Sequence, residues 1–129
     1  MAYDGTDYFG FQRQAAGTPT IQGEIESAIF RTTREQVTLT GAGRTDTGVH
    51  ASGQVVAFDV IWRHPVSDLQ RALNAHLPDA ISVRDVALAE GFHPRFDARN
   101  RAYVYSLYTG AVRDPLKDRF MWLASRGPL

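Results

Sequence analysis

The chain has 129 residues, of which 43% are hydrophobic and 22% charged, and it contains no cysteine. This length is sufficient for one compact domain with a hydrophobic core, and the composition is that of an ordinary folded protein. The lack of cysteine excludes disulfides and zinc–thiolate sites. No apolar run approaches the roughly 20 residues of a membrane-spanning helix, so we expect no membrane association and a cytoplasmic location.

The formal net charge is zero, but charge is unevenly distributed along the chain. Residues 1–94 carry 7 basic and 11 acidic residues, whereas residues 95–119 carry 6 basic and 3 acidic residues. A local excess of positive charge can attract phosphates even on a neutral protein. The same excess is also compatible with an ordinary solvated surface, so it indicates nucleic-acid binding only in combination with a motif.

The predicted elements begin with a strand of which only residues 1–3 are present, so we expect the first strand to be truncated. A helix follows from residue 21, because isoleucine and alanine recur at helical spacing behind a Pro-Thr start signal. Strands are then predicted at 37–40, from alternation of apolar and polar residues, and at 54–60, from β-branched and apolar residues.

A second helix is predicted to open at Pro65, and a fourth strand follows at 81–86. The order strand, helix, strand, strand, helix, strand is the split βαβ pattern of a ferredoxin-like α+β domain, which we assign to residues 1–90. One further long strand is predicted at 101–109 from its period-two alternation. We interpret residues 91–129 as this connecting strand and the start of a linker to an absent C-terminal domain.

The segment most indicative of chemistry is residues 41–50, Gly-Ala-Gly-Arg-Thr-Asp-Thr-Gly-Val-His, between two predicted strands. Its glycines suit a loop with unusual dihedral angles and close backbone approach. Arg44 and Asp46 lie two residues apart within it. A guanidinium beside a carboxylate keeps the carboxylate ionised and oriented, as a nucleophile or a base requires. A purely structural ion pair would explain this spacing equally well.

Other interpretations of the glycine-rich segment fail on its residues. A phosphate-binding P-loop needs a lysine after the glycines, and a dinucleotide-binding fingerprint needs glycine at the position of Asp46. Asp46 and His50 are two possible metal ligands, but no third lies in register. We therefore expect no metal and no cofactor.

Six ordered segments between residues 3 and 105 carry a family resemblance. Together they resemble the tRNA pseudouridine synthase A family, and this chain is similar to its N-terminal portion. Thr47 stands where that family usually has alanine. The matching segments are residues 41–51 for the active-site signature, 3–14 for the opening segment, 20–24 for the first helix start, 73–78, 92–96, and 101–105 for an Arg-x-Tyr-x-Tyr strand.

The resemblance implies an isomerase that converts uridine to pseudouridine at positions 38–40 of the tRNA anticodon arm, without metal or cofactor. It implies Asp46 as the catalytic carboxylate, either as nucleophile or as base toward the ribose, with Arg44 holding it. Tyr103 is implied to pack on the target base, because an extruded base regains stacking on an aromatic face. Arg95 and Arg101 are candidate phosphate contacts.

The resemblance also implies a homodimer and a second α+β domain that closes the active-site cleft. Two alternatives to a complete enzyme therefore stay open. In the first alternative, the chain is a catalytically incomplete RNA-binding fragment. In the second, it is a dimerisation module of the same family.

Overall fold

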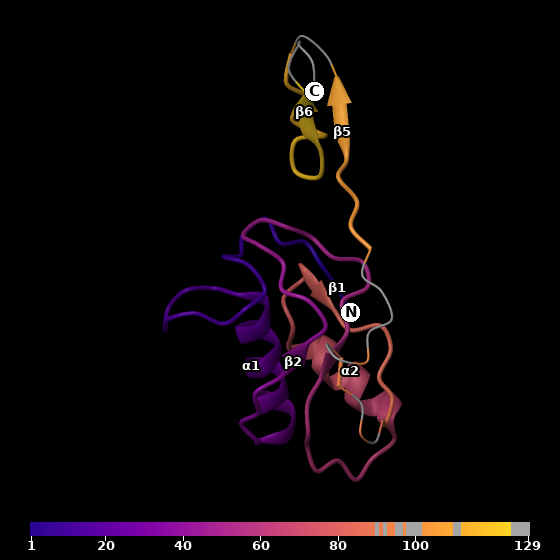
Figure 1. Cartoon of the computed structure of the whole chain (residues 1–129). Coiled ribbons are helices and arrows are strands. Elements are labelled where there is room, and N and C mark those ends of the chain that lie inside the picture. The colour runs from indigo at the N-terminus through magenta and orange to yellow at the C-terminus, as the bar shows by residue number, and fades with distance from the viewer. Residues whose placement is uncertain (90, 92, 95–96, 98–101, 110–111, 125–129) are drawn as a thin grey trace. The chain divides into compact units, whose positions relative to one another are not determined.

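The computed structural model describes residues 1–89, 91, 93–94, 97, 102–109 and 112–124 (Figure 1). The chain divides into two compact units, Met1–Arg99 and Asn100–Leu129. In the described residues no helix is long and apolar enough to cross a membrane. The elements of the first unit are β1 (Ala2–Tyr3), α1 (Ile21–Thr33), β2 (Thr40–Gly41), β3 (Val56–Ala57), α2 (Val66–His76) and β4 (Ile81–Ser82).

Helix α1 begins where the sequence predicts it. Thr20 has extended backbone angles and accepts a hydrogen bond from the amide of Gly23 at 3.2 Å, as an N-cap residue does. The helix ends at Arg34, whose left-handed φ of 65° returns its amide to the carbonyl of Phe30 at 2.8 Å. One face of α1 is buried because its apolar residues recur at helical spacing: Ile21, Ile25, Ala28 and Ile29.

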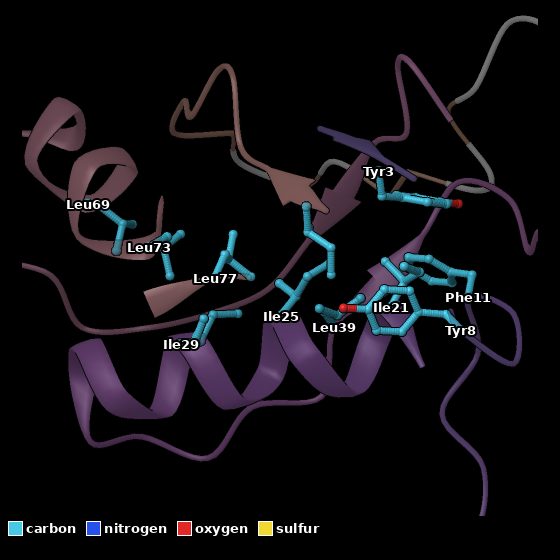
Figure 2. Close-up of a cluster of buried hydrophobic side chains, with 12 residues drawn as sticks. Tyr3, Tyr8, Phe11, Ile21, Ile25, Ile29, Leu39, Leu69, Leu73 and Leu77 are labelled. Atoms are coloured by element: carbon cyan, nitrogen blue, oxygen red, sulfur yellow. The ribbon is translucent and has the colours of Figure 1, made fainter. Parts of the chain in front are cut away.

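Helix α2 confirms the predicted opening at Pro65, which is its N-cap residue. It buries Leu69 and Leu73 and packs against α1. Figure 2 shows the resulting core, in which leucines of α2 meet isoleucines of α1 and the aromatic side chains of the N-terminal segment lie at one end. The aromatic end of this core is formed by Tyr3, Tyr8 and Phe11.

The strands of the first unit are joined through β1. Tyr3 of β1 lies opposite Ile81 of β4 in an antiparallel pair, and it also forms an antiparallel bridge with Ala51. The chain continues from Ala51 into β3, which pairs antiparallel with β2. The first unit thus has two small antiparallel sheets, β1–β4 and β2–β3, and the isolated bridge between Tyr3 and Ala51 links the first of them to the segment leading into β3. This arrangement is compatible with the split βαβ pattern, and the predicted α+β class is confirmed.

The strands are shorter than predicted at 37–40 and 54–60. In the first of them, a side chain binds a backbone group that a longer ladder would use. The amide of Leu39 donates to the buried carboxylate of Glu26 at 3.0 Å. The amide of Ile61, just beyond the second of these segments, donates to the side chain of Glu35 at 2.9 Å. The amide of Leu39 is therefore not available to a neighbouring strand.

The predicted strand 81–86 ends early for the same kind of reason. The side-chain amide of Asn74 in α2 donates to the carbonyl of Val83 at 2.8 Å and accepts from its N–H at 2.8 Å. Asn74 therefore takes both backbone groups of Val83, and β4 stops at Ser82.

This pair of hydrogen bonds gives a testable effect on stability. Replacing Asn74 by alanine removes both bonds and detaches the end of β4 from α2. We expect the free energy of unfolding to fall by about 1 to 2 kcal/mol, measured by urea unfolding. Asn74→Asp keeps an acceptor for the N–H of Val83 but loses the donor. Its free energy of unfolding should lie between those of the unmodified chain and Asn74→Ala. Equal stability of all three proteins would contradict a structural role for these bonds.

The second unit contains β5 (Leu107–Thr109) and β6 (Trp122–Ala124), which pair in parallel with Leu107 opposite Trp122. The predicted strand at 101–109 is therefore wrong in extent, since residues 102–106 lie outside any strand. The ladder with β6 reaches only the last three residues of the prediction. Strand β6 was not predicted at all.

Candidate active site

Asp46 lies in a loop whose backbone is held by the N-terminal segment on both sides of it. The amide of Phe11 donates to the carbonyl of Thr45 at 3.0 Å, and the amide of Gly48 donates to the carbonyl of Tyr8 at 3.2 Å. Within the loop, the amide of Val49 donates to the carbonyl of Asp46 at 3.1 Å. The main chain at Asp46 is therefore fixed while its side chain is exposed to solvent.

Two glycines of the N-terminal segment allow this close approach. Gly10 has a φ of 88°, and a Cβ at this position would lie 3.0 Å from the carbonyl oxygen of Thr45. At Gly5 a Cβ would overlap the carbonyl group of Val49, with the carbonyl carbon at only 2.8 Å. Any side chain at these positions would push the loop away, so glycine is required for the loop to lie on this segment.

Polar side chains below the loop complete its support. The hydroxyl of Tyr3 lies 2.7 Å from the hydroxyl of Thr45. The buried side chain of Gln54 donates to the carbonyl of Gly43 at 2.9 Å. The two residues that flank Arg44 in the loop are thus tied to β1, through Tyr3, and to the segment that leads into β3, through Gln54.

Burial raises the pKa of the Tyr3 phenol above its ordinary value of 10.0, while hydrogen bonds with Thr45 and Gln54 lower it by less. Because the folded-state pKa is raised, the protonated phenol stabilises the fold fully below about pH 10, and this contribution is lost as the pH rises through the folded-state value. We expect the free energy of unfolding to fall above about pH 10. Tyr3→Phe should remove part of that fall. The rest should persist in the variant, because burial also raises the pKa of Tyr8. Identical pH profiles for the variant and the unmodified chain would contradict this expectation.

A carboxylate on α1 binds the chain just before β2 and the loop. Glu26 is buried, and its Oε2 accepts from the amide of Leu39 at 3.0 Å and from the side chain of Gln22 at 3.0 Å. The guanidinium of Arg13 lies 3.2 Å from its other oxygen. Glu26 therefore joins α1, the N-terminal segment and the residues that lead into β2.

His50, at the far end of the loop, is occupied by the turn that contains Gly5. Its Nδ1 accepts from the amide of Gly5 at 2.9 Å. In the same turn, a carboxylate oxygen of Asp4 accepts from the amide of Thr6 at 3.0 Å. These contacts assign His50 to holding the turn against the loop.

The described residues include only part of the predicted site, and within that part Arg44 and Asp46 do not pair. Arg44 and Asp46 are both exposed, and the ion pairs of the described residues include none between them. Tyr103 belongs to the second unit, where its side chain is 67% exposed. Arg95 and Arg101 lie outside the described residues. In the part of the chain that the structure describes, no group of three possible metal ligands occurs.

Comparison with known proteins places this loop in a family context. A family model described as tRNA pseudouridine synthase matches residues 1–97. A tRNA pseudouridine synthase A of Neisseria gonorrhoeae is 48% identical over 124 residues, which are 95% of this chain and 47% of the relative. The tRNA pseudouridine synthase A 1 of Desulfotalea psychrophila is 47% identical over 122 residues, or 94% of this chain and 48% of the relative.

A third relative, tRNA pseudouridine synthase A of Moorella thermoacetica, is 44% identical over 124 residues, or 95% of this chain and 50% of the relative. The chain thus spans about half the length of the curated relatives it matches. The family match covers the whole glycine-rich loop and the N-terminal segment that supports it. The chain therefore belongs to the tRNA pseudouridine synthase family.

Proposed function

We propose that this chain contributes the catalytic carboxylate of a tRNA pseudouridine synthase, and that Asp46 is this carboxylate. The reaction breaks the bond between N1 of uracil and C1′ of the ribose and forms a bond between C5 and C1′. The proton on C5 is lost to solvent and N1 gains a proton, so the conversion is an isomerisation without oxidant or reductant. Asp46 acts on the ribose, either at C1′ as a nucleophile or as the base that removes a ribose proton.

The observation that carries this proposal is the exposed carboxylate on a fixed main chain. Family membership supports the reaction type, and the hydrogen bonds at Thr45, Asp46 and Gly48 support the residue. Catalytic groups act through a held geometry, since misplacement by about 1 Å reduces the rate by about two orders of magnitude. A loop without such bonds would not hold a carboxylate in one place.

The remaining assignments belong to the same proposal. We infer that the substrate is the anticodon arm of tRNA, that Tyr103 packs on the extruded base, and that Arg95 and Arg101 contact phosphates. Arg44 would hold Asp46 once the nucleotide is bound. We further infer that residues 1–90 form the catalytic domain, that residues 91–129 lead out of it, and that the enzyme acts as a homodimer in the cytoplasm.

The test is release of tritium from C5-labelled uridine in unmodified tRNA transcripts. Two proteins are compared: this chain, and a chimera that continues it with the second half of the Neisseria gonorrhoeae relative. Release by either protein supports the proposal. Release by the chimera alone means that this chain forms only part of the active site. Salt-sensitive tRNA binding without release by either protein would favour an RNA-binding role instead.

A further inference from the structure

We propose that Tyr3 is a positioning residue that fixes both ends of the loop carrying Asp46. The inference rests on the proposed function for its catalytic consequence, whereas its structural part stands on contacts of the described residues. Tyr3 lies on β1, 43 positions before Asp46 in the sequence, and nothing in the local pattern of residues 1–6 indicates such a role.

The first part of the argument is that one residue reaches both ends of the loop. The main chain of Tyr3 donates to the carbonyl of Ala51 at 2.9 Å and accepts from its amide at 3.1 Å. The side chain of Tyr3 extends to the other end, where its hydroxyl lies 2.7 Å from that of Thr45. Asp46 follows Thr45 directly, so the loop between the two contacts contains the catalytic carboxylate.

The second part is that Tyr3 is itself fixed. It is only 4% exposed, and its main chain is held between β4 and Ala51. Its ring stacks on Phe11, with ring centroids 6.3 Å apart and an interplanar angle of 29°. Figure 2 shows the hydroxyl of Tyr3 directed away from the leucines of α2. A buried and stacked ring restricts the hydroxyl to one position, which is what a support must do.

The third part is that Thr45 is held from two directions. Its hydroxyl meets Tyr3, and its carbonyl accepts from the amide of Phe11 at 3.0 Å. Tyr3 stacks on Phe11, so both contacts to Thr45 come from one stacked pair of aromatic residues. Removing the hydroxyl of Tyr3 leaves one of the two contacts in place, so the loop should loosen while the fold persists.

Amide hydrogen exchange measures this loosening without requiring turnover. The reporters are two amides: that of Gly48, which donates to the carbonyl of Tyr8, and that of Val49, which donates to the carbonyl of Asp46. In Tyr3→Phe we expect both to exchange about two- to tenfold faster, the range expected for the loss of one hydrogen bond. The amide of Leu77, which closes α2 by donating to Leu73 at 3.0 Å, should be unchanged.

A matched control removes a tyrosine hydroxyl from the same core. Tyr8 is also buried, and its hydroxyl bonds no loop residue among those the structure describes. Tyr8→Phe should therefore leave the exchange of Gly48 and Val49 unchanged. Thr45→Val removes only the contact with Thr45, so it should accelerate this exchange by no more than Tyr3→Phe does. The double variant should match Tyr3→Phe, because that change already removes the shared bond.

Unchanged exchange of Gly48 and Val49 in Tyr3→Phe, or equal acceleration at Leu77, would overturn the inference. In the tritium-release assay, the protein that turns over should lose kcat by about two- to tenfold in Tyr3→Phe with KM unchanged, because Tyr3 acts through Asp46. Unchanged kcat in a protein that still requires Asp46 overturns the positioning role and leaves the proposed function standing. Turnover that survives loss of Asp46 instead removes the proposed function, while the exchange result stays valid.

Discussion

Replacing Asp46 by asparagine is expected to abolish pseudouridine formation while leaving the fold intact. Asparagine has the same shape, but its amide is neither a nucleophile nor a base. Loss of a catalytic group of this kind lowers kcat by a factor of roughly 10⁴ or more. Because the side chain is exposed, the free energy of unfolding should change by no more than about 0.5 kcal/mol. Tritium release and urea unfolding of the same preparation measure the two effects.

The matched control for this variant is Asp59→Asn. Asp59 is also exposed but lies outside the loop and outside any helix or strand. It should retain full turnover, since the two variants make the same chemical change at different places. Binding of tRNA at one fixed salt concentration should be equal for both variants. Substantial turnover by Asp46→Asn, or an equal loss in Asp59→Asn, would contradict the assignment of Asp46.

The largest loss of stability is expected from Gly5→Ala. The new methyl group would overlap the carbonyl group of Val49, with the carbonyl carbon at 2.8 Å. The obstacle is main chain rather than the flexible end of a side chain, so it cannot move alone. We expect the free energy of unfolding to fall by about 3 kcal/mol, the upper part of the range for inserting a methyl group into a packed site. Turnover should fall as well, because the loop must shift.

Gly53→Ala is the control, because a Cβ at Gly53 meets no atom within 4 Å and its φ is not in the left-handed region. It should be neutral or slightly stabilising, since alanine reduces the freedom of the unfolded chain. Denaturant midpoints of the two variants give the comparison. A Gly5→Ala protein as stable as Gly53→Ala would mean that the loop does not pack on the turn at residues 4–6.

Both helices were predictable from the sequence because their cause is local. The isoleucines of α1 recur at helical spacing behind Thr20, and Pro65 marks the start of α2. The α+β class followed from the order of these elements. That Asp46 lies in a loop also followed from the surrounding glycines, which favour unusual dihedral angles.

The strand limits and the support of the loop were not predictable, because their causes are distant in sequence. Leu39 is bonded to Glu26 and Val83 to Asn74, and each bond removes a group that strand propensity assumes is free for pairing. The contact between Tyr3 and Thr45 spans 42 positions. In β6 only Trp122 is of a type favoured in strands, and one such residue does not predict a strand.

The central place of β1 also determines when the loop can assemble during synthesis. Tyr3 is made 48 positions before its partner Ala51 and 78 positions before its partner Ile81. At about 5 to 20 residues per second, residues 4–82 take roughly 4 to 16 seconds. β1 lacks both partners until Ala51 has been made, and it lacks β4 until Ile81 has been made. A nascent chain of this protein therefore carries an unpaired edge at β1, and chaperones that bind short aromatic segments have time to reach it.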